Sequence, residues 1–94
     1  MILAYADKRT ETFARGGTIP GFQGFRAQAE RRLAILESAT SLEDLRGLPS
    51  NRLEALRGDR RGKWSIRINR QWRICFSWPA GSPGPTEVEI VDYH

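Results

Sequence analysis

Residues 57–78 have the sequence RGDRRGKWSIRINRQWRICFSW, and this stretch decides the fold. Apolar and polar side chains alternate along residues 64–68 and again along residues 72–78, which is the period of a half-buried β-strand. The three residues between the two runs are few enough for the loop of a β-hairpin. A three-residue loop pairs Ile66 with Ile74 and puts every large apolar side chain on one face. A two-residue loop mixes the faces, so we predict the three-residue register.

The same register places two arginines, Arg67 and Arg73, directly across from each other on the polar face. Like charges in a cross-strand pair destabilise a sheet, so the pairing needs an interpretation. One interpretation is a pair of solvated surface arginines. The other is an anion site, because the planar donor fork of arginine matches a phosphate group. The hairpin alone leaves both open.

The length of the chain, 94 residues, fits one domain with a modest core. The single cysteine, Cys75, has no partner for an internal disulfide, and its mid-strand position indicates a small buried side chain in a reducing compartment. No basic region precedes a long apolar run at the N-terminus, so no signal peptide is evident. No segment reaches membrane-spanning length. These features predict a cytoplasmic protein without a membrane partner.

Positive charge is concentrated in the hairpin region. Residues 51–78 carry eight basic and two acidic side chains, whereas residues 79–94 carry three acidic side chains and no Lys or Arg. A dispersed excess of charge is typical of a solubilising surface. A basic block interleaved with aromatic side chains instead indicates a polyanionic partner, and nucleic acid fits best.

The rest of the chain predicts helices first and strands last. Asp7 is suited to cap a first helix that ends near Arg15. Apolar side chains at three- and four-residue spacing predict a second helix from about residue 22 or 23 to Thr40. A capping-box pattern at Ser41 predicts one further helical turn. Short strands are predicted at residues 1–5, 53–56 and 86–91, although the composition of 53–56 also favours helix. The fold class is therefore α+β, with two N-terminal helices packed on a mainly antiparallel sheet of about four to five strands.

The chemical groups of the chain exclude several classes of enzyme. One His, one Cys and scattered acids form no recognisable metal-ligand set, so we expect no metal and no other cofactor. A Gly-x-Ser-x-Gly elbow and a Gly-rich phosphate loop are both absent. The terminal Asp92-Tyr93-His94 is either a frayed end or part of a site for metal-independent RNA cleavage. That reaction needs a base for the 2′-hydroxyl, cations for the phosphorane and an acid for the leaving oxygen, and imidazole and arginine suit these roles.

A longer pattern resembles a known family of toxins. It runs over residues 53–76 as LEALRGDRRGKWSIRINRQWRICF and is completed by the terminal VDYH. This pattern resembles the HigB branch of the RelE/ParE toxin superfamily. The resemblance implies a compact RelE-like fold and a ribosome-dependent mRNA endoribonuclease of a type II toxin–antitoxin system. It also implies a HigA-like helix-turn-helix antitoxin, contact with operator DNA only through that antitoxin, and the 70S ribosome and mRNA as further partners.

The resemblance also implies roles for individual residues. Arg73 is expected to stabilise the phosphate, and the terminal Asp92-Tyr93-His94 is expected to form the active-site end. Arg57 joins the catalytic set at a basic position where relatives often carry Lys. Glu54 occupies a position where relatives place a His, which shifts proton transfer onto Tyr93 and His94. The expected RNA-binding residues are Arg60, Arg61, Lys63, Arg67 and Arg70.

Other functions fit the same features. A ParE-like gyrase poison has the same fold and needs no catalytic His, and it would leave mRNA ends unchanged. A non-catalytic RNA- or ribosome-binding module would block translation through Arg57, Arg67 and Arg73 without cleaving the message. A weak, domesticated toxin is a third alternative, which the departure at Glu54 permits.

Overall fold

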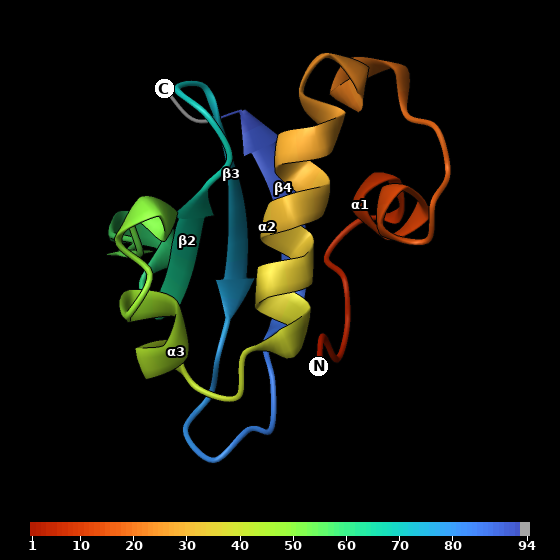
Figure 1. Ribbon diagram of the computed structural model, residues 1–94. Helices are drawn as coiled ribbons and strands as arrows, with labels where there is room; N and C mark the ends of the chain where they lie inside the picture. Colours follow the sequence, from red (N-terminus) through yellow and green to blue (C-terminus); the bar gives the residue numbers. More distant parts are fainter. Residues whose placement is uncertain (93–94) are drawn as a thin grey trace.

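One four-stranded antiparallel sheet, in the order β1-β2-β3-β4, organises this computed structural model, which describes residues 1–92 (Figure 1). The strands are β1 (Glu54–Ala55), β2 (Lys63–Arg67), β3 (Trp72–Ser77) and β4 (Thr86–Asp92). The α-helices are α1 (Lys8–Ala14), α2 (Arg26–Ser38) and α3 (Leu42–Arg46), and the 3₁₀ helices are η1 (Pro20–Phe25), η2 (Pro49–Asn51) and η3 (Gly58–Arg60). The predicted α+β arrangement, with the two N-terminal helices on one side of an antiparallel sheet, is confirmed.

The hairpin of β2 and β3 has the predicted three-residue register. Ile66 pairs with Ile74, and Arg67 pairs with Arg73. The side chain of Asn69 closes the loop, because its Oδ1 accepts two backbone N–H hydrogen bonds, each 2.8 Å long. The apolar side chains of both strands therefore face the helices.

The core lies between this apolar face and the helices. Both the helices and the sheet contribute large side chains that are at most 1% exposed, namely Phe13, Phe22, Leu36, Ile66, Ile74, Phe76 and Val88. The helix predicted to begin at residue 22 or 23 begins instead at Arg26, after the 3₁₀ helix η1. Side chains at i and i+3 lie on one face of a 3₁₀ helix, so Phe22 and Phe25 both point into the core. No helix within residues 1–92 has the length and apolar character that crossing a membrane requires.

The N-terminal segment differs from the strand expected at residues 1–5. Among these residues only Tyr5 forms a β-bridge, which is parallel and pairs with Val88. Backbone hydrogen bonds still tie the segment to β4: Ala6 N–H donates to the Val88 carbonyl at 2.8 Å, and Val88 N–H donates to the Ala4 carbonyl at 3.1 Å. The segment thus covers the outer edge of the sheet, where unpaired backbone groups would otherwise be exposed.

Thr10 of α1 also covers the β4 edge of the sheet. Its side chain is fully buried, and its Oγ1 accepts a hydrogen bond from the Ile90 N–H at 2.9 Å. Thr10→Val keeps the shape but leaves this buried N–H without its acceptor, so we expect the free energy of unfolding to fall by about 1–3 kcal/mol. Urea unfolding curves measure the change. Thr10→Ser keeps the hydroxyl and is expected to cost about 1 kcal/mol, and an unchanged midpoint for Thr10→Val would contradict the prediction.

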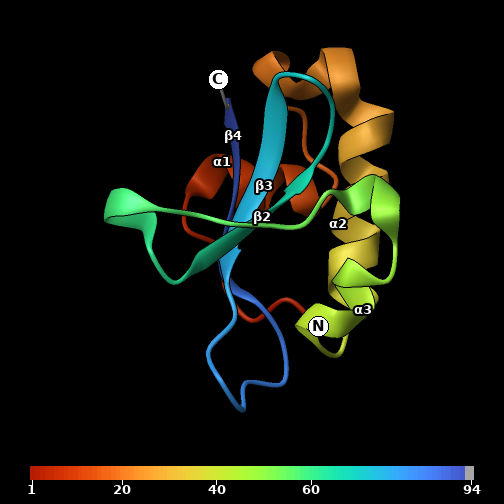
Figure 2. The same ribbon diagram turned by 90° about the vertical axis from the view of Figure 1, so that its left-hand side faces the viewer.

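The outer strands also differ in length from their predictions. β1 contains only Glu54 and Ala55, which pair with Ser65 and Trp64 of β2, so the strand expected over 53–56 is half as long. β4 extends one residue further than expected, to Asp92. In Figure 2 the segment that contains β1 crosses in front of the sheet, on the side opposite α1. This segment brings new side chains next to the polar face.

Candidate active site

The face of the sheet turned away from α1 is polar, and we call it the open face. Side chains alternate along each strand, so residues paired across strands lie on the same face. The cross-strand rows of the open face are Arg67, Arg73 and Val91; Glu54, Ser65, Cys75 and Glu89; and Lys63 and Ser77. The hairpin therefore presents Arg67, Arg73 and Lys63 on one surface, as its register predicted.

Arg73 is buried and held in place on the open face. It is only 7% exposed. Its Nε donates to Ser65 Oγ at 2.8 Å, its Nη2 donates to the Arg52 carbonyl, and the same Nη2 lies 3.6 Å from Glu54 Oε1. A guanidinium fixed by several acceptors is ordered before any substrate arrives, which is the property required of an electrostatic catalyst.

Arg67, the partner of Arg73 across the strands, reaches in the other direction. Its Nε donates to the carbonyl of Asn69 in the hairpin loop at 3.1 Å. The two guanidinium groups thus diverge, one toward the loop and the other toward Ser65, which relieves the like-charge repulsion. The interpretation of two solvated arginines is wrong for Arg73, because its side chain is buried among protein acceptors.

The loop before β1 supplies the carbonyl that receives Arg73. Arg52 adopts a left-handed conformation with φ 46°, which non-glycine residues rarely adopt. The preceding Asn51 is fully buried: its Oδ1 accepts from Arg32 Nη1 at 2.7 Å, and its Nδ2 donates to the Leu45 carbonyl at 3.0 Å. These hydrogen bonds anchor the loop before β1 to both α2 and α3. Sequence reasoning missed this support, because no local pattern marks an arginine for a left-handed turn.

Glu54 and Arg57 share an open hollow at the β1 edge of the sheet. The hollow is lined by Glu54, Ala55, Leu56 and Arg57. The Glu54 side chain is 53% exposed while its carboxylate faces Arg73. Arg57 therefore lines the same hollow as Glu54, whose carboxylate also lies beside Arg73.

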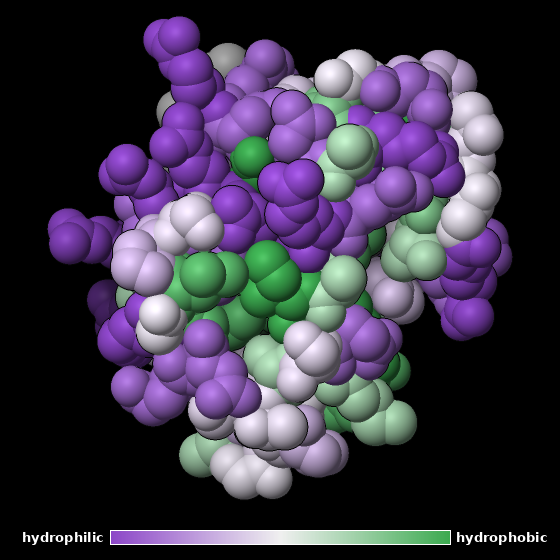
Figure 3. Space-filling model, viewed as in Figure 1, coloured by the Kyte–Doolittle hydropathy of each residue, from purple (hydrophilic) through white to green (hydrophobic). Residues whose placement is uncertain are grey.

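Two of the predicted RNA-binding residues form ion pairs with β4. Arg60 Nη1 lies 3.9 Å from Glu89 Oε1, and Lys63 Nζ lies 3.5 Å from Glu87 Oε1. Partly exposed ion pairs of this kind contribute little free energy, so neither carboxylate would prevent its cation from binding another anion. Arg61 and Arg70, which belong to the same predicted RNA-binding set, are exposed. Hydrophilic side chains project along the left edge of Figure 3, beside the segment that joins β1 to β2.

Cys75 lies in the middle of the open face but is not a nucleophile. It is fully buried, as predicted, and burial raises the pKa of its thiol above the ordinary value. The thiol is therefore protonated at neutral pH, and the thiolate is the reactive form. Among residues 1–92, no group of three or more His, Cys, Asp or Glu side chains is placed to hold a metal ion.

Of the terminal Asp92-Tyr93-His94, only Asp92 lies within the described residues. It ends β4, one residue beyond Val91, which is paired with Arg73. Its Oδ2 accepts a hydrogen bond from Gln71 Nε2 in the hairpin loop at 3.0 Å. Asp92 itself pairs with Trp72, so the alternation of β4 puts its side chain on the face opposite Arg73, and Val91 is the residue of β4 in the row of Arg73. Tyr93 and His94 lie outside the described residues, and their roles stay predictions.

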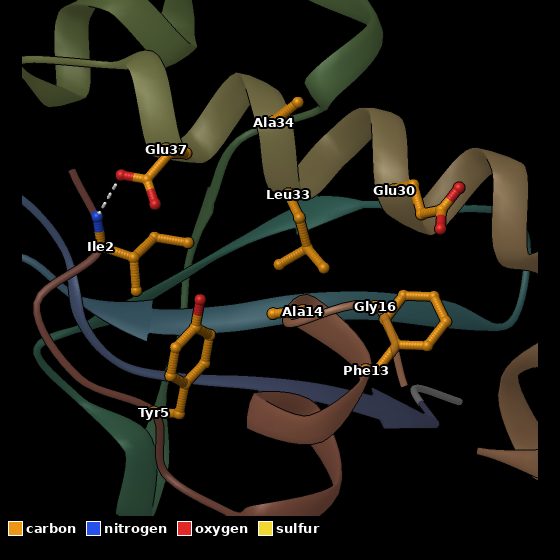
Figure 4. A pocket seen from close by; sticks show the side chains of 9 residues that line it. All are labelled: Ile2, Tyr5, Phe13, Ala14, Gly16, Glu30, Leu33, Ala34 and Glu37. Atoms are coloured by element: carbon orange, nitrogen blue, oxygen red, sulfur yellow. Dashed lines mark hydrogen bonds between the residues drawn. The ribbon is translucent and has the colours of Figure 1, made fainter. Parts of the chain in front are cut away.

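A separate cavity of about 240 Å³ lies between α1, α2 and the N-terminal segment (Figure 4). Its lining includes Tyr5, Phe13 and Leu33, and its rim is closed where Ile2 N–H donates to the Glu37 carboxylate at 2.9 Å. Burial and then the nearby Glu37 raise the pKa of the Tyr5 hydroxyl. None of the predicted site residues lines this cavity, so the open face is the candidate active site.

Comparisons with known proteins agree with the fold. A toxin from Agrobacterium tumefaciens described as YoeB/ParE superposes with a TM-score of 0.60 at 14% sequence identity, over 99% of this chain and 98% of that chain. At this identity the likeness concerns the fold alone. It matches the RelE-like arrangement that the sequence resemblance implied.

Sequence comparisons identify the family. Toxin HigB-1 from Vibrio cholerae serotype O1 is 47% identical over 51 residues, which are 54% of this chain and 54% of that protein. Endoribonuclease HigB from Proteus vulgaris is 36% identical over 63 residues, which are 67% of this chain and 65% of that protein. The matches thus span between half and two thirds of these relatives. The family model for the RelE-like toxin of type II toxin-antitoxin system HigB matches residues 5–94, and the chain therefore belongs to the HigB-like toxin family.

Proposed function

We propose that this chain is the toxin of a type II toxin–antitoxin system and acts as a ribosome-dependent mRNA endoribonuclease. The observation that carries the proposal is the ordered Arg73 guanidinium in a basic open face. The name of one curated relative, Endoribonuclease HigB, supports the same activity. The expected reaction is metal-independent attack of a 2′-hydroxyl on the adjacent phosphate, which leaves a 2′,3′-cyclic phosphate or a 3′-phosphate.

The proposed roles are those that the family resemblance implies. Arg73, with Arg57 at the nearby hollow, stabilises the charge that develops on the phosphate. The terminal Asp92-Tyr93-His94 supplies proton transfer, since an imidazole exchanges protons near neutral pH. The RNA backbone is bound by the surrounding basic side chains, namely Arg60, Arg61, Lys63, Arg67 and Arg70.

The proposed partners are a HigA-like helix-turn-helix antitoxin, the 70S ribosome and mRNA in the cytoplasm. Contact with operator DNA is proposed only through the antitoxin. A free ribosome-independent nuclease would need a complete substrate cleft, whereas the hollow lined by Glu54 and Arg57 is open to solvent. The ribosome would supply the rest of the substrate geometry, which is the physical reason for ribosome dependence.

End mapping of mRNA tests this function. Purified protein is incubated with a message either alone or bound to ribosomes, and the new 5′ ends are located by primer extension. We expect discrete new ends with ribosomes and few without them. Intact messages with blocked translation would favour a non-catalytic ribosome-binding module. Intact messages with broken DNA in the presence of gyrase would favour the ParE-like alternative.

A further inference from the structure

Arg52 has a backbone conformation that residues with a side chain rarely adopt. Its φ of 46° and ψ of 54° lie in the left-handed region, where Cβ crowds the following carbonyl oxygen. The side chain does not explain this conformation, because it is exposed. The carbonyl does have a partner, since it accepts a hydrogen bond from Nη2 of Arg73. The strained residue therefore lies next to the cation proposed to bind phosphate.

The surrounding chain holds the peptide in this conformation. The 3₁₀ helix η2 brings Asn51 N–H to the Leu48 carbonyl at 3.0 Å and Arg52 N–H to the Pro49 carbonyl at 3.1 Å. The buried side chain of Asn51 ties the same turn to α2 and α3. Left-handed residues of this kind persist only where neighbouring contacts fix them, and they concentrate at functional sites. The place of this strain thus points to a role for the Arg52 carbonyl.

We propose that the left-handed backbone of Arg52 positions the Arg73 guanidinium for catalysis. The inference rests on the proposed function, because it concerns the orientation of the group that would bind the phosphate. Nε and Nη2 share one edge of the planar guanidinium. Ser65 Oγ accepts from Nε and the Arg52 carbonyl accepts from Nη2, whereas the bond from Nη2 to the Ser65 carbonyl is longer, at 3.4 Å. Acceptors from two separate segments, β2 and the turn before β1, thus fix the direction of the plane.

Arg52 is a positioning residue, because it acts through Arg73 and touches no reacting atom. An extended backbone at residue 52 would turn its carbonyl away from Nη2 of Arg73. Glu54 would not replace this acceptor, since its Oε1 lies 3.6 Å from Nη2, beyond hydrogen-bond distance, and its side chain is 53% exposed. Misplacing a catalytic group by about 1 Å can lower a rate by about 100-fold. The conformation of residue 52, rather than its charge, is therefore expected to control the rate.

Substitutions at residue 52 separate the backbone conformation from the side chain. Arg52→Gly, Arg52→Ala and Arg52→Val all remove the same charge, but the left-handed conformation is open to Gly, unfavourable for Ala and most unfavourable for the β-branched Val. On ribosome-bound mRNA we expect kcat of Arg52→Val to lie about 10- to 100-fold below that of Arg52→Gly, with Arg52→Ala between them. KM is expected to change equally in all three, because each lacks the same cation. If Arg52→Val does not fold, the comparison of Arg52→Ala with Arg52→Gly decides. Thr10→Val, a destabilising change on the opposite edge of the sheet, is the control and should keep the wild-type kcat.

Nuclear magnetic resonance supplies a readout that does not depend on cleavage. The buried Nε–H of Arg73, bonded to Ser65 Oγ, is expected to exchange slowly with water and to give a proton–nitrogen signal that Arg73→Lys identifies by its loss. Arg52→Val is expected to shift or broaden this signal, while Arg52→Gly and Thr10→Val preserve it. An unchanged signal in Arg52→Val, equal kcat across the folded residue-52 variants, or an equal fall of kcat in Thr10→Val would overturn the positioning role alone. A wild-type protein that cleaves no ribosome-bound message would overturn the proposed function and this inference with it.

Discussion

Arg73→Ala is expected to lower the rate of mRNA cleavage by about 100- to 1,000-fold, the usual cost of removing one ordered donor from a developing negative charge. The effect is large because Arg73 is fixed in advance by Ser65 Oγ and by the Arg52 carbonyl. Alanine also removes these bonds and leaves Glu54 without its cation. We therefore expect a loss of about 1–3 kcal/mol in the free energy of unfolding. Cleavage of ribosome-bound mRNA and thermal melts measure the two effects separately.

Two further variants make the Arg73 experiment decisive. Arg67→Ala removes the cross-strand partner, whose Nε donates to the Asn69 carbonyl in the hairpin loop, so we expect weaker RNA binding and a raised KM with kcat retained. Arg73→Lys keeps the charge but loses the planar fork that bonds two acceptors at once, so its rate should lie between those of alanine and arginine. Equal kcat for folded Arg73→Ala and the wild type would remove Arg73 from the catalytic residues.

The hairpin register was predictable because the period of two leaves only one assignment that gathers Ile66, Ile74 and Phe76 on one face. The same register correctly put Arg67 across from Arg73. A strand pattern does not indicate the direction in which a long side chain turns. The direction of Arg73 depends on the loop before β1, whose left-handed Arg52 is held by the buried Asn51. Such long-range support is invisible in a local pattern.

Glu54 is a second residue whose surroundings a local sequence pattern does not show. Relatives place a His at this position, so the sequence alone suggests that a proton-transfer group has been lost. In the structure β1 pairs Glu54 with Ser65, which also accepts a hydrogen bond from Arg73, so the Glu54 carboxylate lies at the site. The chemistry of a position is therefore decided by the neighbours that the sheet brings to it.

Phe22→Ala is expected to lower the free energy of unfolding by about 3–5 kcal/mol, the range for removing a buried phenylalanine. Sequence periodicity placed this residue at the start of a long helix. In the structure the residue is fully buried in η1, and its ring contacts others from three separate elements. Its centroid is 5.5 Å from that of Phe13 and 5.7 Å from those of Phe25 and Trp72.

This cluster connects α1 and η1 to the hairpin through Trp72, so a cavity at Phe22 weakens the contact between the helices and the sheet. Small domains have a total stability of about 5–15 kcal/mol, and each kcal/mol shifts Tm by about 4–8 °C at this size. Thermal melts of Phe22→Ala are therefore expected to show a loss of well over 10 °C. Leu48→Ala, at a side chain that is 40% exposed, is the control and should stay within about 0.5 kcal/mol of the wild type. If the two variants melt together, the aromatic cluster does not hold the helices on the sheet.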